Sequence, residues 1–497
     1  MRFIRIHPRD NVAVALEEAH PGDVFRDGGP EITVRETIPR GHKMALSDLG
    51  AGREIIKYGN TIAIATAQIP AGSWVHTHNV KTGLSEEADY VYEHVTYELP
   101  VHAPRTFRGY RRADGRAAIR NELWILPIVG CVNGIAKQLT EQNQDLVRGS
   151  IDGLYYFPHP FGCSQLGDDL AQTKKLLAAL ANHPNAGGVL CLGLGCENLV
   201  LDMFREALGD YDPERIRFLI TQETSDELEE GRKLLTELAA YAGRFTREEI
   251  PASELVVGMK CGGSDGLSGI TANPAVGRFS DRLIALGGST VLTEVPEMFG
   301  AENILFSRCE NAQVFDKAVK MVNDFKKYFT DHGQVVYENP SPGNKEGGIT
   351  TLEDKSCGCV QKGGSAQIVD VLSYAEPVVK KGLNLLSGPG NDLVSATDLT
   401  AAGAHLILFT TGRGTPSERL RQPSRFPPIR RFMRKNPAGS ILMREPWQTG
   451  RKHWMRPETG FWTMCCGWRE ENLLSRRSMA AGKSRFLKTA WYCRSSG

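Results

Sequence analysis

The first part of the chain alternates short apolar runs with turn residues, and this pattern predicts a small β-rich domain over residues 1–97. Runs such as NVAVAL, EITVRETI and IIKYGNTIAIATAQI change between apolar and polar positions with a period close to two. Gly, Pro and Asp separate the runs, as turns between strands require. Pro100 and Pro104 then predict a linker over residues 98–104.

The next two blocks mix apolar strands with amphipathic helices, so the predicted fold class is multidomain α/β with parallel sheets. Residues 105–250 contain the strand-like runs ELWILPIVGC, GGVLCLGLGC and IRFLI. Residues 251–416 contain LNLLSGPG, NDLVSATDLTAAG and HLILFTTGRGTP, which predict a strand, a helix and a parallel strand. We expect the two glycine-rich loops of this unit to emerge side by side, at the sheet edge where ligands bind.

Residues 417–497 differ from the rest of the chain in composition. They hold 18 Lys and Arg but only five Glu, so this tail carries +13 and the body carries −12. Five of the seven Trp lie in the tail, which contains neither Val nor Asp, and natural domains rarely have such a composition. The tail is therefore expected to lack a regular fold.

Charge and hydropathy exclude two classes of partner. The acidic body argues against binding of nucleic acid, and no apolar run reaches the roughly 20 residues that a membrane helix needs. The N-terminus shows no secretory signal, so we expect a cytoplasmic protein without a membrane partner. Scattered cysteines in such a protein predict free thiols rather than disulfides.

His76 and His78 form the pattern His-Thr-His near the end of an expected strand. Residues i and i+2 of a strand point to the same face, so both imidazoles can converge on one metal ion. The alternative is a pair of surface histidines.

Three glycine-rich loops in the third block carry short polar side chains. Backbone N–H groups of such loops can bind a small, oxygen-rich anion. The side chains that accompany these loops as candidate substrate ligands are Ser264, Asp265, Asn344 and Asn391. Glu297 and Lys355 are candidates for acid–base chemistry, although a plain ion pair is the alternative.

Three cysteines follow apolar strands and precede polar residues: Cys131, Cys163 and Cys196. We interpret them as site residues, whereas Cys191, Cys309 and Cys357 are expected to be small buried side chains. Arg120 and Asn121 precede the first of these strands and offer a carboxylate-binding pair.

The whole set of motifs resembles the altronate and galactarate dehydratase family over residues 1–416. The resemblance rests on IKYG, VHTHN, RNELWILPIVGCVNGIA, GCSQLGDD, GLGCEN, CGGSDGLSGITANP, LTEVPEMFGAE, ENPSPGNKEGGITTLEDKS and TTGRGTP. Where the family often has Leu, this chain has Cys357, which we interpret as a packing variant.

The resemblance implies an N-terminal SAF (β-clip) domain followed by two α/β domains, the last of which is catalytic. It also implies loss of water from a sugar acid with Fe²⁺, which Mn²⁺ can replace. In this scheme His76 and His78 bind metal or act as the base, and Cys131, Cys163, Cys196 and Cys261 complete the metal site. The glycine-rich loops, including Arg413, bind the substrate carboxylate.

Several alternatives stay open at this stage. Overall resemblance favours altronate, converted to 2-dehydro-3-deoxy-gluconate, over galactarate. An iron–sulfur hydro-lyase would also use several unpaired cysteines. A non-catalytic acid-binding remnant is a further possibility, and a homo-oligomer is neither indicated nor excluded.

We interpret the tail as the family's C-terminus translated in a shifted reading frame. One constant offset lets codons for SERLRQPSRFPPIRRFMRKNPAGSILMREPW also encode FGAFAPTVKISTNSALYEKNPGWIDFNAG. A basic extension without structure is the alternative. A shifted frame would remove elements that cover the last sheet, so we expect the chain as written to be unstable and weakly active.

Overall fold

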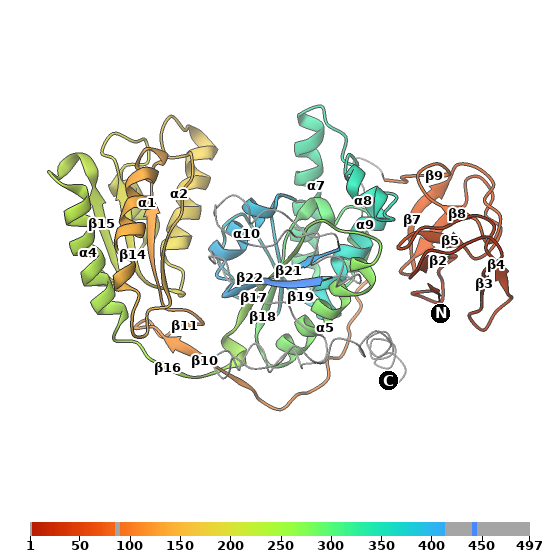
Figure 1. The fold of residues 1–497 in the computed structure, drawn as a ribbon, viewed down its shortest axis with the longest axis horizontal. Helices are drawn as coiled ribbons and strands as arrows, with labels where there is room; N and C mark the ends of the chain where they lie inside the picture. Colours follow the sequence, from red (N-terminus) through yellow and green to blue (C-terminus); the bar gives the residue numbers. More distant parts are fainter. Residues whose placement is uncertain (1, 85–89, 413–439, 445–497) are drawn as a thin grey trace.

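A computed structural model describes residues 2–84, 90–412 and 440–444 of the chain. Three domains lie in a row, with the third domain in the centre, the N-terminal domain on its right and the second domain on its left (Figure 1). From the N-terminal domain, the chain runs along the third domain before it enters the second, and Val95 donates a backbone hydrogen bond to Ser307 on the way. The order in space therefore differs from the order in sequence.

The N-terminal domain consists of short strands, as its alternating pattern predicts, and these strands pair antiparallel. Its sheets have the orders β1-β2-β5-β8, β6-β7-β9 and β3-β4. The strands are β1 (Phe3–Ile4), β2 (Val12–Ala15), β3 (Val24–Phe25), β4 (Ile32–Thr33), β5 (Lys43–Ala45), β6 (Glu54–Lys57), β7 (Asn60–Ala65), β8 (Trp74–Val75) and β9 (Val80–Lys81).

The second domain has a parallel sheet with the order β13-β12-β14-β15, covered by helices. Its strands are β12 (Glu122–Pro127), β13 (Gly153–Tyr156), β14 (Ala186–Gly193) and β15 (Ile216–Ile220). Its helices are α1 (Asn133–Gln142), α2 (Gly167–Ala181), α3 (Leu201–Leu208) and α4 (Glu227–Ala242). A small antiparallel sheet of β10 (Thr106–Arg111), β11 (Ala117–Ala118) and β16 (Arg247–Pro251) joins this domain to the third.

The third domain contains a larger sheet with the order β19-β20-β18-β17-β21-β22. The strands are β17 (Val256–Cys261), β18 (Ser289–Leu292), β19 (Ile368–Leu372), β20 (Leu383–Leu386), β21 (Leu406–Thr411) and β22 (Ser440–Arg444). The helices are α5 (Ala272–Ala285), α6 (Glu302–Phe306), α7 (Ala312–Asp331), α8 (Pro342–Glu346), α9 (Leu352–Cys359) and α10 (Asp392–Ala401).

The predicted crossover exists as β20, α10 and β21, but the expectation that its two glycine-rich loops emerge side by side is wrong. β18 and β17 lie between β20 and β21 in the sheet. The loop after β21 instead meets the Gly-Ser-Asp-Gly loop, because Gly412 donates a backbone hydrogen bond to Gly263. A local pattern shows that two strands are parallel, but strands from elsewhere in the chain decide whether the two are neighbours.

Five residues of the basic tail form β22, which pairs antiparallel with β21. The sequence pattern did not predict this strand. The rest of the tail lies outside the described residues, and so does Arg413, which precedes the tail. The proposed frameshift therefore stays a prediction.

Candidate active site

A buried group of metal-ligating side chains lies at the carboxyl end of β17. The Cys261 thiol donates a hydrogen bond to Glu297 Oε2 over 2.9 Å, and the sulfurs of Cys261 and Cys359 are 3.4 Å apart. Among the described residues, these three form the group whose ligand atoms all lie within 4.8 Å of one another. All three side chains are buried, so the group is shielded from bulk water.

Local backbone structure brings the group together. Glu294 has a left-handed φ of 73°, which turns the chain after β18 so that Glu294 and Glu297 return to Cys261. Glu294 Oε2 accepts a hydrogen bond from the Cys261 backbone N–H over 2.9 Å. Thr351 caps the N-terminus of α9, and Lys355 and Cys359 then lie one turn apart on one face of that helix.

Two buried lysines balance the charge of this group. Lys355 Nζ lies 2.8 Å from Glu297 Oε1, and Lys362 Nζ donates to Cys261 Sγ over 3.0 Å. Burial opposes ionisation of Glu297, but the two ammonium groups outweigh it and lower the pKa of that carboxyl. Burial would lower the pKa of Lys355, but the negative charge of Glu297 outweighs it and raises that pKa. Lys355 is therefore held as an ammonium.

Glu294 differs from its neighbour Glu297 in electrostatic environment. Burial, together with the negative charge of Glu297, raises the pKa of Glu294 in spite of the nearby Lys260 ammonium. Lys260 Nζ lies 3.0 Å from Glu294 and 2.8 Å from Asp392, which belongs to the first turn of α10. Two carboxyls whose pKa values are pushed apart are typical of acid–base sites.

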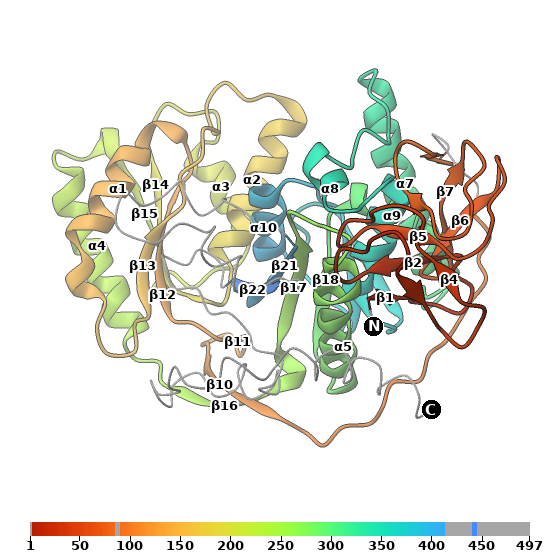
Figure 2. The ribbon, with the colours of Figure 1, turned by 45° about the vertical axis from the view of Figure 1, so that its right-hand side comes forward.

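The N-terminal domain contributes directly to this region. Asp354 is fully buried between Lys43 and Lys57, with Nζ–Oδ distances of 2.7 and 3.0 Å. A pocket at this boundary is lined by Lys57, Tyr58, Ser264, Asp265, Gly266, Ser268, Gly269, Asn273, Ile349, Asp354, Lys355, Gly358 and Cys359. Tyr58 packs closely there, since a Cβ atom on Gly269 would lie 2.5 Å from its hydroxyl. Figure 2 shows the N-terminal domain lying over the face that carries α9.

The glycine-loop residues predicted from the sequence lie around the same pocket. Ser264 Oγ points to Cys261 Sγ at 3.6 Å, and its backbone oxygen accepts from Asn344 Nδ2 over 2.8 Å. Asp265 accepts hydrogen bonds from the backbone N–H groups of Leu267 and Ser268. The structure thus brings Ser264, Asp265 and Asn344 next to the buried group, although their roles as substrate ligands stay predictions.

Asn391 lies farther along the sheet. Its side chain caps α10 by accepting from the backbone N–H groups of Leu393 and Val394. It precedes Asp392, which contacts Lys260, so it is linked to the buried carboxylates through that lysine.

The expectation that His76 and His78 lie in a strand is wrong. β8 ends at Val75, and residues 76–79 form a turn in which Asn79 N–H donates to the His76 carbonyl. The two imidazoles still gather, because both rings contact Trp74 at 5.2 Å between centroids. Their role as metal ligands or base stays a prediction.

His42 joins this cluster and was not found from the sequence. Its ring lies 4.8 Å from that of His76, and its Nδ1 accepts from Trp74 Nε1 over 3.2 Å. Burial, with help from the charges of Lys43, His42 and His78, lowers the pKa of His76 to about 4. The His76 imidazole is therefore neutral near pH 7, and its buried Nδ1 has no hydrogen-bond partner.

Arg120 and Asn121 lie at the amino end of β12, away from the carboxyl edge of the sheet. Arg120 pairs with Glu122 over 3.0 Å, and the buried Asn121 accepts from Arg112 and donates to the Ala242 carbonyl. These contacts hold the start of β12 against neighbouring segments of the second domain. A substrate role for the pair stays a prediction.

The eight cysteines of the described residues are all free. Cys191, Cys309 and Cys357 are buried, as predicted. Cys131, Cys163 and Cys196 are exposed in the second domain, so the structure separates them from the buried Cys261.

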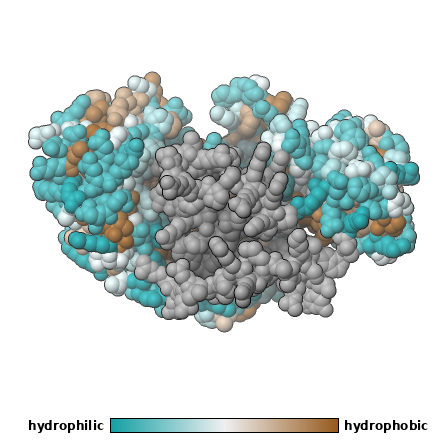
Figure 3. Space-filling model, viewed as in Figure 1, coloured by the Kyte–Doolittle hydropathy of each residue, from teal (hydrophilic) through white to brown (hydrophobic). Residues whose placement is uncertain are grey.

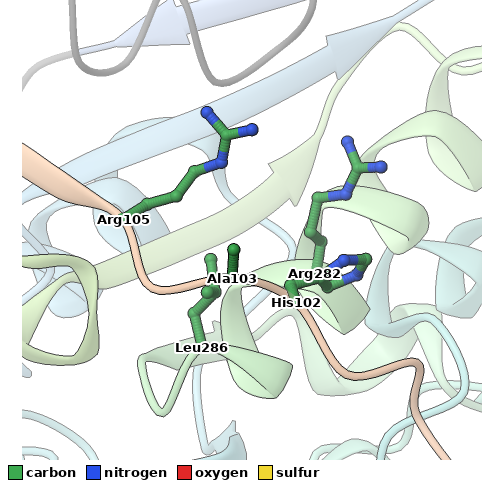
Figure 4. A pocket seen from close by; sticks show the side chains of 5 residues that line it. All are labelled: His102, Ala103, Arg105, Arg282 and Leu286. Carbon is green, nitrogen blue, oxygen red and sulfur yellow. The ribbon is translucent and has the colours of Figure 1, made fainter.

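A different hollow lies where the linker crosses α5. It is lined by His102, Ala103, Arg105, Arg282 and Leu286 (Figure 4). These five residues include two guanidinium groups and an imidazole but no carboxylate. They lack the paired acid and base that dehydration requires.

Comparison with known proteins identifies the family to which the three domains belong. Three family models match in order: the altronate/galactarate dehydratase SAF domain over residues 1–83, the D-galactarate dehydratase/altronate hydrolase second domain over 109–243, and the D-galactarate/altronate dehydratase C-terminal domain over 252–424. The chain belongs to the altronate and galactarate dehydratase family. Its N-terminal domain is therefore a SAF domain, and the family is one of hydro-lyases.

Three relatives match across most of their length. The altronate dehydratase of Escherichia coli K12 is 54% identical over 84% of this chain and 85% of its own. That of Bacillus subtilis 168 is 54% identical over 83% of this chain and 84% of its own. The galactarate dehydratase (L-threo-forming) of E. coli K12 is 35% identical over 83% and 82%. In the described part of the chain, no helix combines the length and apolar character needed to cross a membrane.

Proposed function

We propose that this protein is an altronate dehydratase, which converts D-altronate to 2-dehydro-3-deoxy-D-gluconate and water. The observation that carries the proposal is the 54% identity to two altronate dehydratases, against 35% to a galactarate dehydratase. The reaction breaks the C2–H and C3–O bonds, and the resulting enol becomes the 2-keto product.

The buried pocket supplies charges that this reaction needs. Removal of the C2 proton places negative charge on a carboxylate that is already anionic, so a nearby cation lowers the barrier. Lys355 lines the pocket and is held as an ammonium by Glu297, so it suits neutralisation of the substrate carboxylate or protonation of the leaving hydroxyl. The Ser264 and Asp265 loop offers polar groups for the sugar hydroxyls.

We assign the C2 base to the imidazole of His76 or His78 and the supporting carboxylate to Glu297. His76 is linked to the pocket through His42, whose Nε2 lies 3.1 Å from the Glu346 carbonyl, and through Lys43, which binds Asp354. A general base must reach the proton directly or through one water. A bound sugar acid would have to span from Lys355 toward these rings.

The residues also fit a metal ion. Cys261, Glu297 and Cys359 would hold it, and when bound it supplies a Lewis-acid charge that stabilises the developing anion. Two sulfurs and a carboxylate suit Fe²⁺ better than Mn²⁺, which prefers oxygen ligands. Binding would displace the Lys362 ammonium, which lies 3.0 Å from Cys261 Sγ.

The direct test is turnover by the purified chain of D-altronate and of D-galactarate, with detection of the 2-keto product. We expect the higher kcat/KM with altronate. Turnover of galactarate alone would mean that the chain is a galactarate dehydratase and not an altronate dehydratase. Binding of altronate without product would mean that the chain is an acid-binding remnant.

A further inference from the structure

The hollow where the linker crosses α5 carries positive charge that the proposed active site does not use. Its volume is about 100 Å³, several times the space that one water molecule needs. His102, Ala103 and Arg105 line it from the linker, and Arg282 and Leu286 line it from the end of α5. Two guanidinium groups and one imidazole therefore border one small space, although they come from segments far apart in the sequence.

Both walls of the hollow are held against the same short turn, residues 252–254. The Arg105 carbonyl accepts a hydrogen bond from the Ala252 backbone N–H over 2.8 Å. The end of α5 lies on this turn as well, because a Cβ atom on Gly288 would be 2.9 Å from the Ala252 carbonyl oxygen. Pro104 restricts the backbone of the linker between the two walls. The backbone therefore fixes the walls independently of the side chains that line them.

The three cationic side chains lack an anionic partner. In the part of the chain that the structure describes, no hydrogen bond or ion pair engages the side chains of His102, Arg105 or Arg282. Other exposed arginines hold a carboxylate, as Arg232 does with Asp145 over 3.0 Å. Positive charges that share one hollow repel one another, so an anion placed between them would bind favourably.

The carboxylates that are close in sequence to the hollow are engaged elsewhere. Glu254, in the turn that supports both walls, accepts a hydrogen bond from Arg111 over 3.0 Å. Asp281, which precedes Arg282, accepts two backbone N–H groups from the loop before β19, over 2.6 and 3.0 Å. It also lies 3.9 Å from Arg278. The residues that line the hollow include no carboxylate, so its charge is not balanced from within.

The directions of the side chains suit a ligand with several oxygens. Figure 4 shows the guanidinium groups of Arg105 and Arg282 pointing to the same side of the linker, with the His102 ring beside Arg282. A guanidinium presents a fork of N–H donors that matches the oxygens of phosphate and carboxylate. An imidazole donates at least one N–H in either charge state. All three groups can therefore donate to one oxyanion.

We propose that this hollow binds a phosphate group, either as inorganic phosphate or as the terminal group of a small phosphate monoester. Two guanidinium charges match a phosphate dianion better than they match a single carboxylate. On the face that Figure 3 shows, most of the coloured surface is hydrophilic and hydrophobic residues form small groups, so charge dominates over apolar contact. Ala103 and Leu286 add a short apolar wall that the carbon atoms of a monoester can contact.

The hollow is separate from the pocket of the proposed active site. Asn273, in the first turn of α5, lines that pocket, whereas Arg282 follows nine positions later in the same helix. At 1.5 Å per residue the two positions are about 14 Å apart along the helix axis. A phosphate group that ties the linker to Arg282 would restrain the helix that carries Asn273. Its binding goes beyond the proposed function, since it requires neither altronate nor its turnover.

The test measures binding of inorganic phosphate to the full chain by isothermal titration calorimetry and ³¹P NMR at low ionic strength. Metal ions are first removed with a chelator, because phosphate also binds iron. The test variants are Arg105→Gln and Arg282→Gln, and circular dichroism checks that each is folded. Arg53→Gln is the matched control, because among the described residues the exposed Arg53 side chain also lacks a partner. Lys355→Met tests whether phosphate binds in the active-site pocket instead.

We expect about one phosphate per chain and a Kd that rises at least about tenfold in each of the two test variants, because each loses charge-assisted hydrogen bonds. Arg53→Gln and Lys355→Met should keep the wild-type affinity. Absence of binding by the wild type at millimolar phosphate would overturn the proposal. Unchanged affinity in both test variants, or loss of binding in Lys355→Met alone, would overturn it as well.

Further titrations identify the source of the phosphate group and its independence from the substrate. Tighter binding of glycerol 3-phosphate than of inorganic phosphate would support a monoester ligand, and the reverse order would support free phosphate. Succinate that binds as tightly as phosphate would refute the phosphate assignment. Excess altronate should leave the phosphate affinity unchanged, whereas competition between the two would refute a separate site. A chain that binds phosphate but does not turn over altronate would contradict only the proposed function.

Discussion

The ammonium of Lys355 lies 2.8 Å from Oε1 of Glu297, and only 8% and 7% of the two side chains are exposed. This pair joins α9 to the turn after β18 and borders both the thiols of the buried group and the pocket. An ion pair in that position can act on a substrate that enters the pocket.

Removal of the Lys355 charge should abolish most of the activity. Lys355→Met keeps the length of the side chain but removes the cation, and loss of an acid–base group typically costs about 10²–10⁴-fold in rate. We expect kcat/KM for altronate to fall by at least about 100-fold. Lys320→Met is the matched control, because the Lys320 side chain is 74% exposed. Near-normal activity of Lys355→Met would show that the lysine is structural only.

Asp354 should be essential for the attachment of the SAF domain. Asp354→Asn leaves Lys43 and Lys57 buried without their counter-charge, which typically costs about 3–5 kcal/mol. Denaturant unfolding should report this loss in the free energy of unfolding. Asp324→Asn, which breaks an exposed pair with Lys320, should change it by less than about 1 kcal/mol. Equal effects of the two substitutions would contradict the prediction.

The protein should lose stability as the pH falls below about 6.5. Burial lowers the pKa of His405 to about 4 and lowers that of His183 as well, so both rings are neutral in the folded state. The unfolded chain binds these protons first, near the ordinary histidine pKa of 6.5, and stability therefore falls between pH 6.5 and 4. His405 alone accounts for up to about 3 kcal/mol, at 1.36 kcal/mol per pKa unit.

The measurement is the free energy of unfolding at a series of pH values. His405→Gln should have a shallower dependence over this range than the wild type. His332→Gln, at a ring hydrogen-bonded on the surface, is the control and should retain the full slope. A wild-type curve that is flat from pH 6.5 to 4 would contradict the assignment of neutral buried histidines.

The buried Cys–Glu–Cys group should bind a divalent ion through its sulfurs. Co²⁺ is a useful probe, because cobalt–thiolate bonds give a charge-transfer absorbance. We expect Cys261→Ser and Cys359→Ser to lose part of this absorbance, whereas Cys357→Leu should retain it. Cys357 is also buried in α9 but is not a member of the group. Identical spectra for all four proteins would show that Co²⁺ binds elsewhere.

The composition of the tail predicts an extra or missing base in the gene between codons 405 and 430. Sequencing of that region tests the hypothesis directly. A chain with the restored frame should unfold at higher denaturant concentration and turn over altronate faster than the chain as written. If the gene has the sequence as given and its product is stable and fully active, the hypothesis is refuted.

Sequence patterns were sufficient for much of the fold. Period-two alternation predicted the short strands of the N-terminal domain, and apolar strands with amphipathic helices predicted the two parallel sheets. Cys131 and Cys196 lie in the loops that directly follow β12 and β14, close to the predicted strand ends, whereas Cys163 lies seven residues after the end of β13. These inferences depend on neighbours within a few residues, which hydrophobic periodicity records.

The active-site geometry could not be obtained in the same way. Cys359 and Lys362 were missed, although the spacing of Cys359 four residues after Lys355 in a helix was a usable signal. Lys57 and Tyr58 were visible only as part of the IKYG motif, and nothing local showed that they would meet Asp354.

The sequence by itself determined the element types, the three-domain order and the kinds of side chain available. Only the tertiary structure decided that Cys261 meets residues 36 and 98 positions away, and that β18 and β17 separate β20 from β21. The physical reason is that periodicity and turn chemistry act over a few residues. The order of strands in a sheet and the docking of one domain on another depend on packing between distant segments.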